Sequence, residues 1–101
     1  MTKIRDYFQE QHEGIPLLFM DPADSYDKAI IGVISGAGVQ PAVAYDYDEV
    51  IKANMAMGMT YDEACEYFSY NQEGAYMGDH TPVFIETMGE EDEYSLPGFG
   101  L

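Results

Sequence analysis

Two short apolar segments, separated by a stretch that contains glycine, constrain the fold of this chain more than any other feature of its sequence. Residues 28–34 (KAIIGVI) and 41–45 (PAVAY) are rich in Ile, Val and Ala, and the β-branched residues favour strands. The intervening SGAGVQ has two glycines that suit a hairpin connection. Pro41 fits the start or edge of a strand, because proline donates no ladder hydrogen bond. The sequence therefore predicts a β-hairpin here.

Helix signals flank this hairpin. Residues 2–13 are expected to form a short amphipathic helix, because apolar side chains recur there at helical spacing. After the hairpin, DYDE at 46–49 and TYDE at 60–63 each place a capping residue three positions before a glutamate, which is the capping-box pattern. Two further helices are therefore predicted, the first ending near Met57 and the second near Gln72.

The remaining apolar segments complete the expected fold. Ile15–Met20 and 81–86 are predicted as short strands, and DPADSYD at 21–27 as a turn. The resulting class is α+β, with a small antiparallel sheet of about three to four strands packed with two to three helices. We expect a single domain over residues 1–87 and a mobile acidic tail over 88–101.

The charge of the chain is strongly one-sided. Nineteen acidic residues face four basic ones, and the formal net charge is −15. The basic residues are Lys3, Arg5, Lys28 and Lys52, so the sequence from Ala53 to Leu101 has ten acids and no Lys or Arg. Direct binding to nucleic acid or to anionic membranes is therefore not expected, because both depend on basic side chains. A basic partner protein, or bound cations, fits the sign.

Cysteine content and apolar run lengths indicate the compartment. The single cysteine, Cys65, cannot form an internal disulfide, which favours a reducing cytosol. The N-terminal MTKIRDYFQEQ lacks the apolar core of a signal peptide, and the longest aliphatic run, AIIGVI, is too short to span a bilayer. A cytoplasmic location is expected.

The predicted third helix is amphipathic when its residues are placed at 100° intervals. Its apolar side is expected to be core, with Cys65 an inert residue at the flank; this side comprises Tyr61, Ala64, Cys65, Tyr67 and Phe68. Asn71 falls in the middle of that side and, if buried, must be hydrogen-bonded. The opposite side carries Asp62, Glu66, Ser69 and Glu73.

The acidic side of this helix allows two interpretations. Asp62 and Glu66 form a like-charge pair one turn apart, which costs roughly 0.2–0.5 kcal/mol. Such a side can serve solubility alone, or it can present carboxylates to a basic partner. For the second interpretation the candidate binding residues are Asp62, Glu66, Glu73 and Asp79.

No catalytic or metal-binding constellation is recognisable. Asp46-Tyr47-Asp48 could hold a cation at a strand end, but Asp46 is better explained as a helix cap. Asp21, Asp24 and Asp27 lack the alternate spacing and distal glutamate of a calcium loop. His12 and His80 are isolated, whereas metal sites need three or four ligands. We therefore expect no enzyme activity, no metal and no cofactor.

One part of the chain resembles a known group of sequences. Residues 58–86 (GMTYDEACEYFSYNQEGAYMGDHTPVFIE), together with KAIIGVI at 28–34 and AYDYDEVI at 44–51, resemble a family of small acidic proteins encoded by bacteriophages and prophages. The family has no established activity, so the resemblance assigns no role to any residue. What it implies is a phage-derived protein acting in a bacterial cytoplasm.

Two functional hypotheses follow. The leading one is an acidic binding protein that inhibits or modulates a basic host protein, which could be a nucleic-acid-binding or defence factor engaged by imitation of DNA charge. The alternative is a small structural or assembly protein that self-associates, for example as a homodimer, since methionines at 55–59 (MAMGM) and exposed tyrosines suit such a surface.

Overall fold

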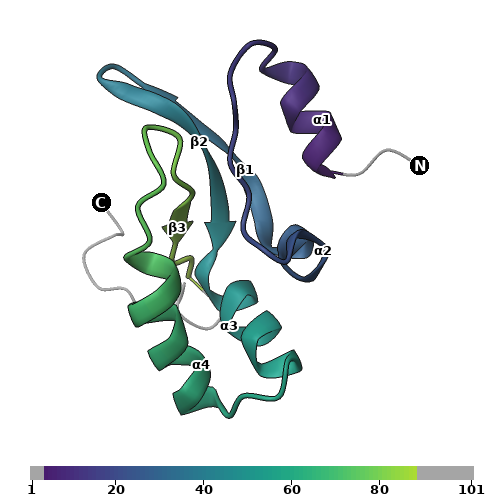
Figure 1. Ribbon diagram of the computed structural model, residues 1–101, viewed down its shortest axis with the longest axis vertical. Helices are drawn as coiled ribbons and strands as arrows, with labels where there is room; N and C mark the ends of the chain where they lie inside the picture. Colours follow the sequence, from purple (N-terminus) through teal and green to yellow (C-terminus); the bar gives the residue numbers. More distant parts are fainter. Residues whose placement is uncertain (1–3, 89–101) are drawn as a thin grey trace, which may run out of the picture.

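The chain folds around a three-stranded sheet with helices on one of its faces and beyond one of its ends (Figure 1). The structure, a computed structural model, describes residues 4–88. In chain order the elements are α1 (Ile4–Gln11), α2 (Ala23–Tyr26), the 3₁₀ turn η1 (Asp27–Ala29), β1 (Ile30–Gly36), β2 (Val39–Asp46), α3 (Tyr47–Ala56), α4 (Tyr61–Tyr67), the π-helical η2 (Phe68–Glu73) and β3 (Val83–Ile85). The predicted α+β class is confirmed. The predicted tail lies, apart from Met88, outside the described residues.

The predicted hairpin is present as β1 and β2, which pair antiparallel. The chain reverses at Ala37–Gly38, where Gly38 has a φ of 75°, a conformation that costs a residue without Cβ very little. The register shifts between Ile30 and Gly32, which leaves Ile31 unpaired and half-exposed. Both strands are longer at the turn than predicted, because the residues that flank Ala37–Gly38 also pair.

The sheet is mixed rather than wholly antiparallel. Its strand order is β1-β2-β3, and β3 runs parallel to β2, with Ala44 opposite Val83 and Tyr45 opposite Phe84. A parallel partner requires the chain to return to the end at which the first strand began. Helices α3, α4 and η2 and the loop over residues 74–82 make that return (Figure 1).

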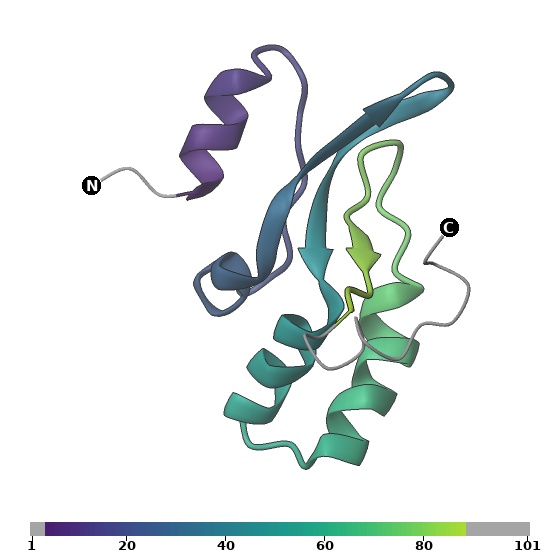
Figure 2. The same cartoon turned by 180° about the vertical axis from the view of Figure 1, so that it is seen from behind.

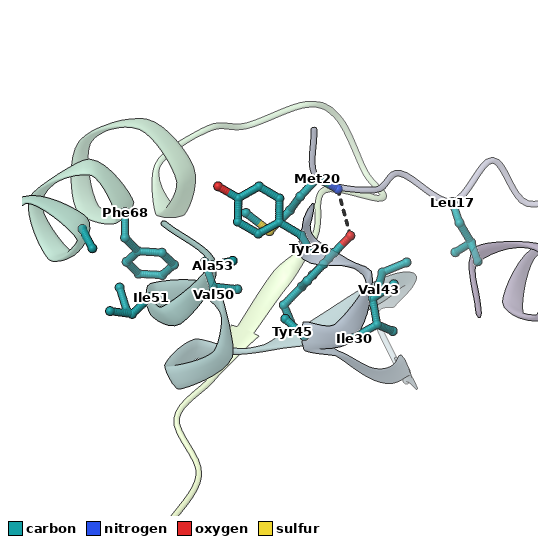
Figure 3. Close-up of a cluster of buried hydrophobic side chains, with 12 residues drawn as sticks. Leu17, Met20, Tyr26, Ile30, Val43, Tyr45, Val50, Ile51, Ala53 and Phe68 are labelled. Atoms are coloured by element: carbon teal, nitrogen blue, oxygen red, sulfur yellow. Dashed lines mark hydrogen bonds between the residues drawn. The ribbon is translucent and has the colours of Figure 1, made fainter. Parts of the chain in front are cut away.

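The segment Ile15–Met20 is not a strand, so this prediction is wrong. It forms no ladder pairing, the N–H of Leu17 donates to the carbonyl oxygen of Ile15 at 2.9 Å, and Leu17 and Met20 are buried against the core. The backbone N–H of Met20 donates instead to the hydroxyl oxygen of Tyr45 at 2.8 Å (Figure 3). The apolar side chains are thus buried as expected, but a tyrosine side chain satisfies a backbone amide in place of a neighbouring strand.

The predicted turn at 21–27 is partly helical. Ala23–Tyr26 forms α2 and Asp27–Ala29 forms η1. Arg5 of α1 holds this region, since its Nε lies 2.8 and 3.0 Å from the two carboxylate oxygens of Asp27 and its guanidinium also reaches Asp24 at 2.7 Å. These contacts raise the pKa of Arg5, chiefly through the hydrogen bond to Asp27. They tie the first helix to the start of β1.

The two predicted helix starts differ in detail. Thr60 and Glu63 form the complete capping box of α4, with both reciprocal hydrogen bonds present. At α3, Asp46 caps the helix by accepting from the N–H of Asp48, but Glu49 pairs with Lys52 at 3.1 Å instead of closing a box. The cap itself was predicted correctly. The box is absent as a whole, because it requires the Asp46 side chain to accept from the N–H of Glu49 rather than from that of Asp48.

The two faces of the sheet differ in their packing. Val33, Val43, Tyr45 and Phe84 face the helices and belong to the buried cluster or pack on it. Side chains that stand opposite each other, or two apart along a strand, share a face. The other face, called here the back face, therefore carries Ile34, Ala42, Ala44, Val83 and Ile85. None of these five belongs to the cluster; Ala42 and Ala44 are nevertheless buried, and Ile34, Val83 and Ile85 are half-buried.

Candidate functional site

Three of the four predicted binding residues lie along one continuous helix. Asp62 and Glu66 are one turn apart on α4, Glu73 is the last residue of η2, and all three are exposed. Asp79 is also exposed, but it lies in the loop before β3, beside the hairpin. Its neighbour His80 is placed there by a 2.6 Å contact between its Nδ1 and the carbonyl oxygen of Pro41. Asp62, Glu66 and Glu73 thus follow α4–η2, whereas Asp79 belongs to the loop that leads to β3 and rises beside the hairpin (Figure 2).

The buried stripe of this helix is narrower than predicted. Ala64 and Phe68 are buried, and the Phe68 ring packs edge-on against Tyr47 and Phe84 at centroid distances of 5.0 and 4.8 Å. Tyr61 and Tyr67, by contrast, keep 59% and 39% of their surface exposed, so their assignment to the core is wrong. Of the five residues of the predicted apolar side, only Ala64, Phe68 and the half-buried Cys65 contact the core, which leaves the two tyrosines exposed to solvent.

The change from α4 to η2 decides which amide enters the core. An i→i+5 helix winds less per residue than an α-helix, so residues after Phe68 are rotated back relative to the α-helical wheel. Asn71, which the wheel placed in the apolar side, is exposed. Gln72 turns inward in its place and reaches residues of α2 and α3. The predicted buried clamp exists, but its residue is Gln72.

Gln72 closes a buried polar network with Asn54 and Tyr26. The side-chain amides of Gln72 and Asn54 pair twice, with Asn54 Nδ2 donating to Gln72 Oε1 at 2.9 Å and Gln72 Nε2 donating to Asn54 Oδ1 at 3.2 Å. The hydroxyl of Tyr26 donates to Asn54 Oδ1 and accepts from Gln72 Nε2 at 2.9 Å. Asn54 Nδ2 also donates to the carbonyl oxygen of Ala64 at 3.3 Å. The network joins α2, α3, α4 and η2, and a satisfied buried network fixes their arrangement.

Tyrosine hydroxyls in the core remain protonated. Burial raises the pKa of Tyr45 to about 12, and burial is also the main reason that the pKa of Tyr26 is raised. The pKa of Tyr47 rises to about 12, first because its hydroxyl lies 3.7 Å from the thiol of Cys65. These hydroxyls therefore act as neutral hydrogen-bonding groups. Cys65 is half-buried against the core, as expected of a small apolar residue.

A pocket of about 150 Å³ opens beside the acidic helix. It lies between α4–η2, the loop that leads to β3 and the chain just before α2, so it is made of three segments distant in sequence. Apolar walls come from Met20, Met77 and Phe84, and polar groups from Asp21, Tyr67, Asn71 and Gln72, among others. Sequence patterns gave no sign of this pocket, because no single segment supplies more than part of its wall.

The isolated polar residues of the sequence have structural partners. The Nδ1 atoms of His12 and His80 lie 2.9 and 2.6 Å from the carbonyl oxygens of Phe8 and Pro41. Over residues 4–88, no group of three or more His, Cys, Asp or Glu side chains is placed to hold a metal ion. None of the helices in this range is both long and apolar enough to cross a bilayer. Comparison of the chain with models of protein families, with curated proteins and with solved structures gave no match.

Proposed function

We propose that this chain is a non-enzymatic binding protein that uses the solvent-facing side of α4–η2 to bind a basic partner protein. This surface, called here the acidic side, consists of the exposed acids Asp62, Glu63, Glu66 and Glu73 and the exposed tyrosines Tyr61, Tyr67 and Tyr70. The resemblance to phage-encoded proteins directs the proposal to a bacterial host factor, whose activity the binding would inhibit or modulate.

The observation that carries the proposal is uncompensated charge next to exposed aromatic surface. Tyr70 keeps 81% of its surface exposed and Tyr67 39%. The sequence from Ala53 onward contains no Lys or Arg that could neutralise the neighbouring carboxylates. Tyrosine is enriched at protein interfaces, where its ring also receives the guanidinium or ammonium group of a partner. Solubility alone accounts for the carboxylates but not for the tyrosines between them.

The carboxylates of the acidic side are too widely spaced to imitate the charge of a DNA duplex closely. Their spacing favours a protein partner that makes several separate contacts with them. Along a helix, Asp62 and Glu66 are separated by about 6 Å of axis. A duplex carries about one charge per 1.7 Å. One row of this density reproduces only part of a phosphate pattern, so competition with DNA for the partner needs a second acidic element or a second copy of the chain.

Capture from bacterial lysate tests this proposal with two charge-matched variants. The first neutralises three of the four acids of the acidic side (Asp62→Asn, Glu66→Gln, Glu73→Gln), and the second removes three exposed acids of the α1 region (Asp6→Asn, Glu10→Gln, Glu13→Gln). The expected result is a basic protein that is retained by the wild-type chain and the α1 variant, is released by salt, and is lost from the acidic-side variant.

Two results would contradict the proposal. One is the absence of any basic protein that elutes between low and high salt. The other is that both variants retain the basic protein equally well, because the interaction would then depend on the net charge of the chain and not on the acidic side. Both variants carry the same charge, so a difference between them reports the location of the surface.

Self-association is the second candidate, and the back face of the sheet favours it. Ile34, Val83 and Ile85 present half-buried apolar side chains beside the small, buried residues Ala42 and Ala44. An apolar sheet face of this kind can pack against a second sheet. Light scattering tests it directly: a dimer that Ile34→Glu converts to a monomer supports the second candidate, and a monomer at high concentration removes it.

A further inference from the structure

We propose that the pocket beside α4–η2 is an anchor site for a single arginine side chain of the basic partner. This inference rests on the proposed function, because it identifies the partner group that the acidic side receives. Binding energy at interfaces is concentrated in a few anchor residues that enter pockets, and arginine is among the commonest of them.

Asp21 is the first observation in support. Asp21, Asp24 and Asp27 recur at every third position, but they are not equivalent in the structure. Arg5 neutralises Asp24 and Asp27. Within residues 4–88 no Lys or Arg lies within ion-pair distance of Asp21, which is exposed at the pocket wall. A carboxylate with both oxygens open to solvent can receive the two parallel N–H groups of a guanidinium.

The aromatic walls are the second observation. Phe84 is held from behind by Phe68 and Tyr45, at centroid distances of 4.8 and 6.1 Å. Tyr67 packs against no other ring among the described residues and keeps part of its surface free. A planar guanidinium stacks on such a ring while its edge bonds to a carboxylate, which the tetrahedral ammonium group of lysine does not do equally well.

The pocket is organised before any partner arrives. Gln72 is fixed by Asn54 and Tyr26, and the hydroxyl of Thr81 donates to the carbonyl oxygen of Gly78 and accepts from the N–H of Met77, both at 2.7 Å. Walls that are already ordered lose little entropy on binding. Asn71 makes no side-chain hydrogen bond to another described residue, so its amide oxygen remains available as a further acceptor.

Size and charge together select the occupant. A volume of about 150 Å³ is well below the roughly 300–1,000 Å³ of pockets that enclose whole cofactors or drug-sized ligands, so it suits one side chain. Anions are repelled by Asp21 and by the net charge of −15. A purely apolar side chain would leave Asp21 and Asn71 without new partners. The cationic, planar end of arginine matches both parts of the wall.

Peptide titrations followed by NMR test the inference. The probes are an oligo-arginine peptide and an oligo-lysine peptide of equal length, added to the wild-type chain, to Asp21→Asn and to the charge-matched control Asp6→Asn on α1. We expect the arginine peptide to bind more tightly than the lysine peptide. We expect Asp21→Asn to weaken arginine binding about tenfold, and Asp6→Asn, at an exposed position of α1, to weaken it less than about twofold. Tyr67→Leu tests the aromatic wall and should remove the preference for arginine.

The outcomes separate this inference from the proposed function. If both peptides bind but Asp21→Asn and Asp6→Asn have equal effects, or if lysine binds as well as arginine, the arginine site is wrong and the acidic side remains. If neither peptide binds the wild-type chain, both proposals fall. Thermal melts of each variant establish that a loss of binding does not come from a loss of folding.

Discussion

Replacing Gln72 with alanine removes three hydrogen bonds from the buried network at once. The side-chain amide of Asn54 then keeps its hydrogen bonds to the carbonyl oxygen of Ala64 and to the hydroxyl of Tyr26. One of its two N–H groups loses its acceptor, and its oxygen loses one of two donors. A buried polar group left without a partner lowers stability by about 1–3 kcal/mol, and the better helix propensity of alanine offsets about a few tenths of a kcal/mol of this loss. We therefore expect Gln72→Ala to lower the free energy of unfolding by about 2 kcal/mol.

The adjacent amide supplies the matched control. Asn71→Ala removes a similar group one residue away, but from an exposed position, so its effect should stay within about 0.5 kcal/mol. Urea denaturation followed by circular dichroism measures the free energy of unfolding of both variants. In thermal melts, the expected fall in Tm for Gln72→Ala is about 8–16 °C. If Asn71→Ala were the more destabilising of the two, the helix would continue as a regular α-helix through this point, and the placement of the network would be wrong.

Three further predictions concern charge, alkaline pH and capping. Raising salt from low concentration to about 0.5 M should increase Tm, because it screens the repulsion of a chain with net charge −15; an unchanged Tm would mean that the carboxylates are locally compensated. Burial raises the pKa of Tyr45 from 10.0, its value in free solution, to about 12 in the folded protein, so its contribution to stability is complete below pH 10 and is lost as pH rises from 10 to 12. That loss amounts to roughly 2–3 kcal/mol, and Tyr45→Phe should lessen it in denaturation curves recorded across this range. Thr60→Ala should cost about 1 kcal/mol through the loss of the α4 cap, and Ser69→Ala, at an exposed position without a cap, is its control.

Local signals were sufficient for the elements whose hydrogen bonds are local. The hairpin follows from two β-prone segments around Ala37–Gly38, and the start of α4 follows from Thr60 and Glu63, because each of these bonds joins residues a few positions apart. Ile15–Met20 shows the limit of such signals. Its apolar composition correctly indicated burial, but strand formation depends on a neighbouring strand, and the neighbour is the side chain of Tyr45, 25 positions away from Met20.

The candidate site divides in the same way. The exposure of Asp62 and Glu66 could be predicted from helical periodicity, because they lie opposite Ala64 and Phe68 on α4; Glu73 is also exposed, but it lies beyond the change of winding. The roles of Asn71 and Gln72 could not, because a wheel assumes one winding angle and the helix changes to a π-helix after Tyr67. The pocket could not be predicted either, because only the tertiary fold brings Asp21 close to Asn71 and Phe84.

The most direct test of the binding surface is the map of backbone amide shifts in the wild-type protein on addition of the oligo-arginine peptide. We expect the largest changes at residues 61–81, on α4, η2 and the loop that leads to β3, together with Asp21. Helix α1 and the tip of the hairpin at Ala37–Gly38 should change little. Changes centred on α1 or on the hairpin tip, or spread evenly over the chain, would contradict the assignment of the acidic side as the binding surface.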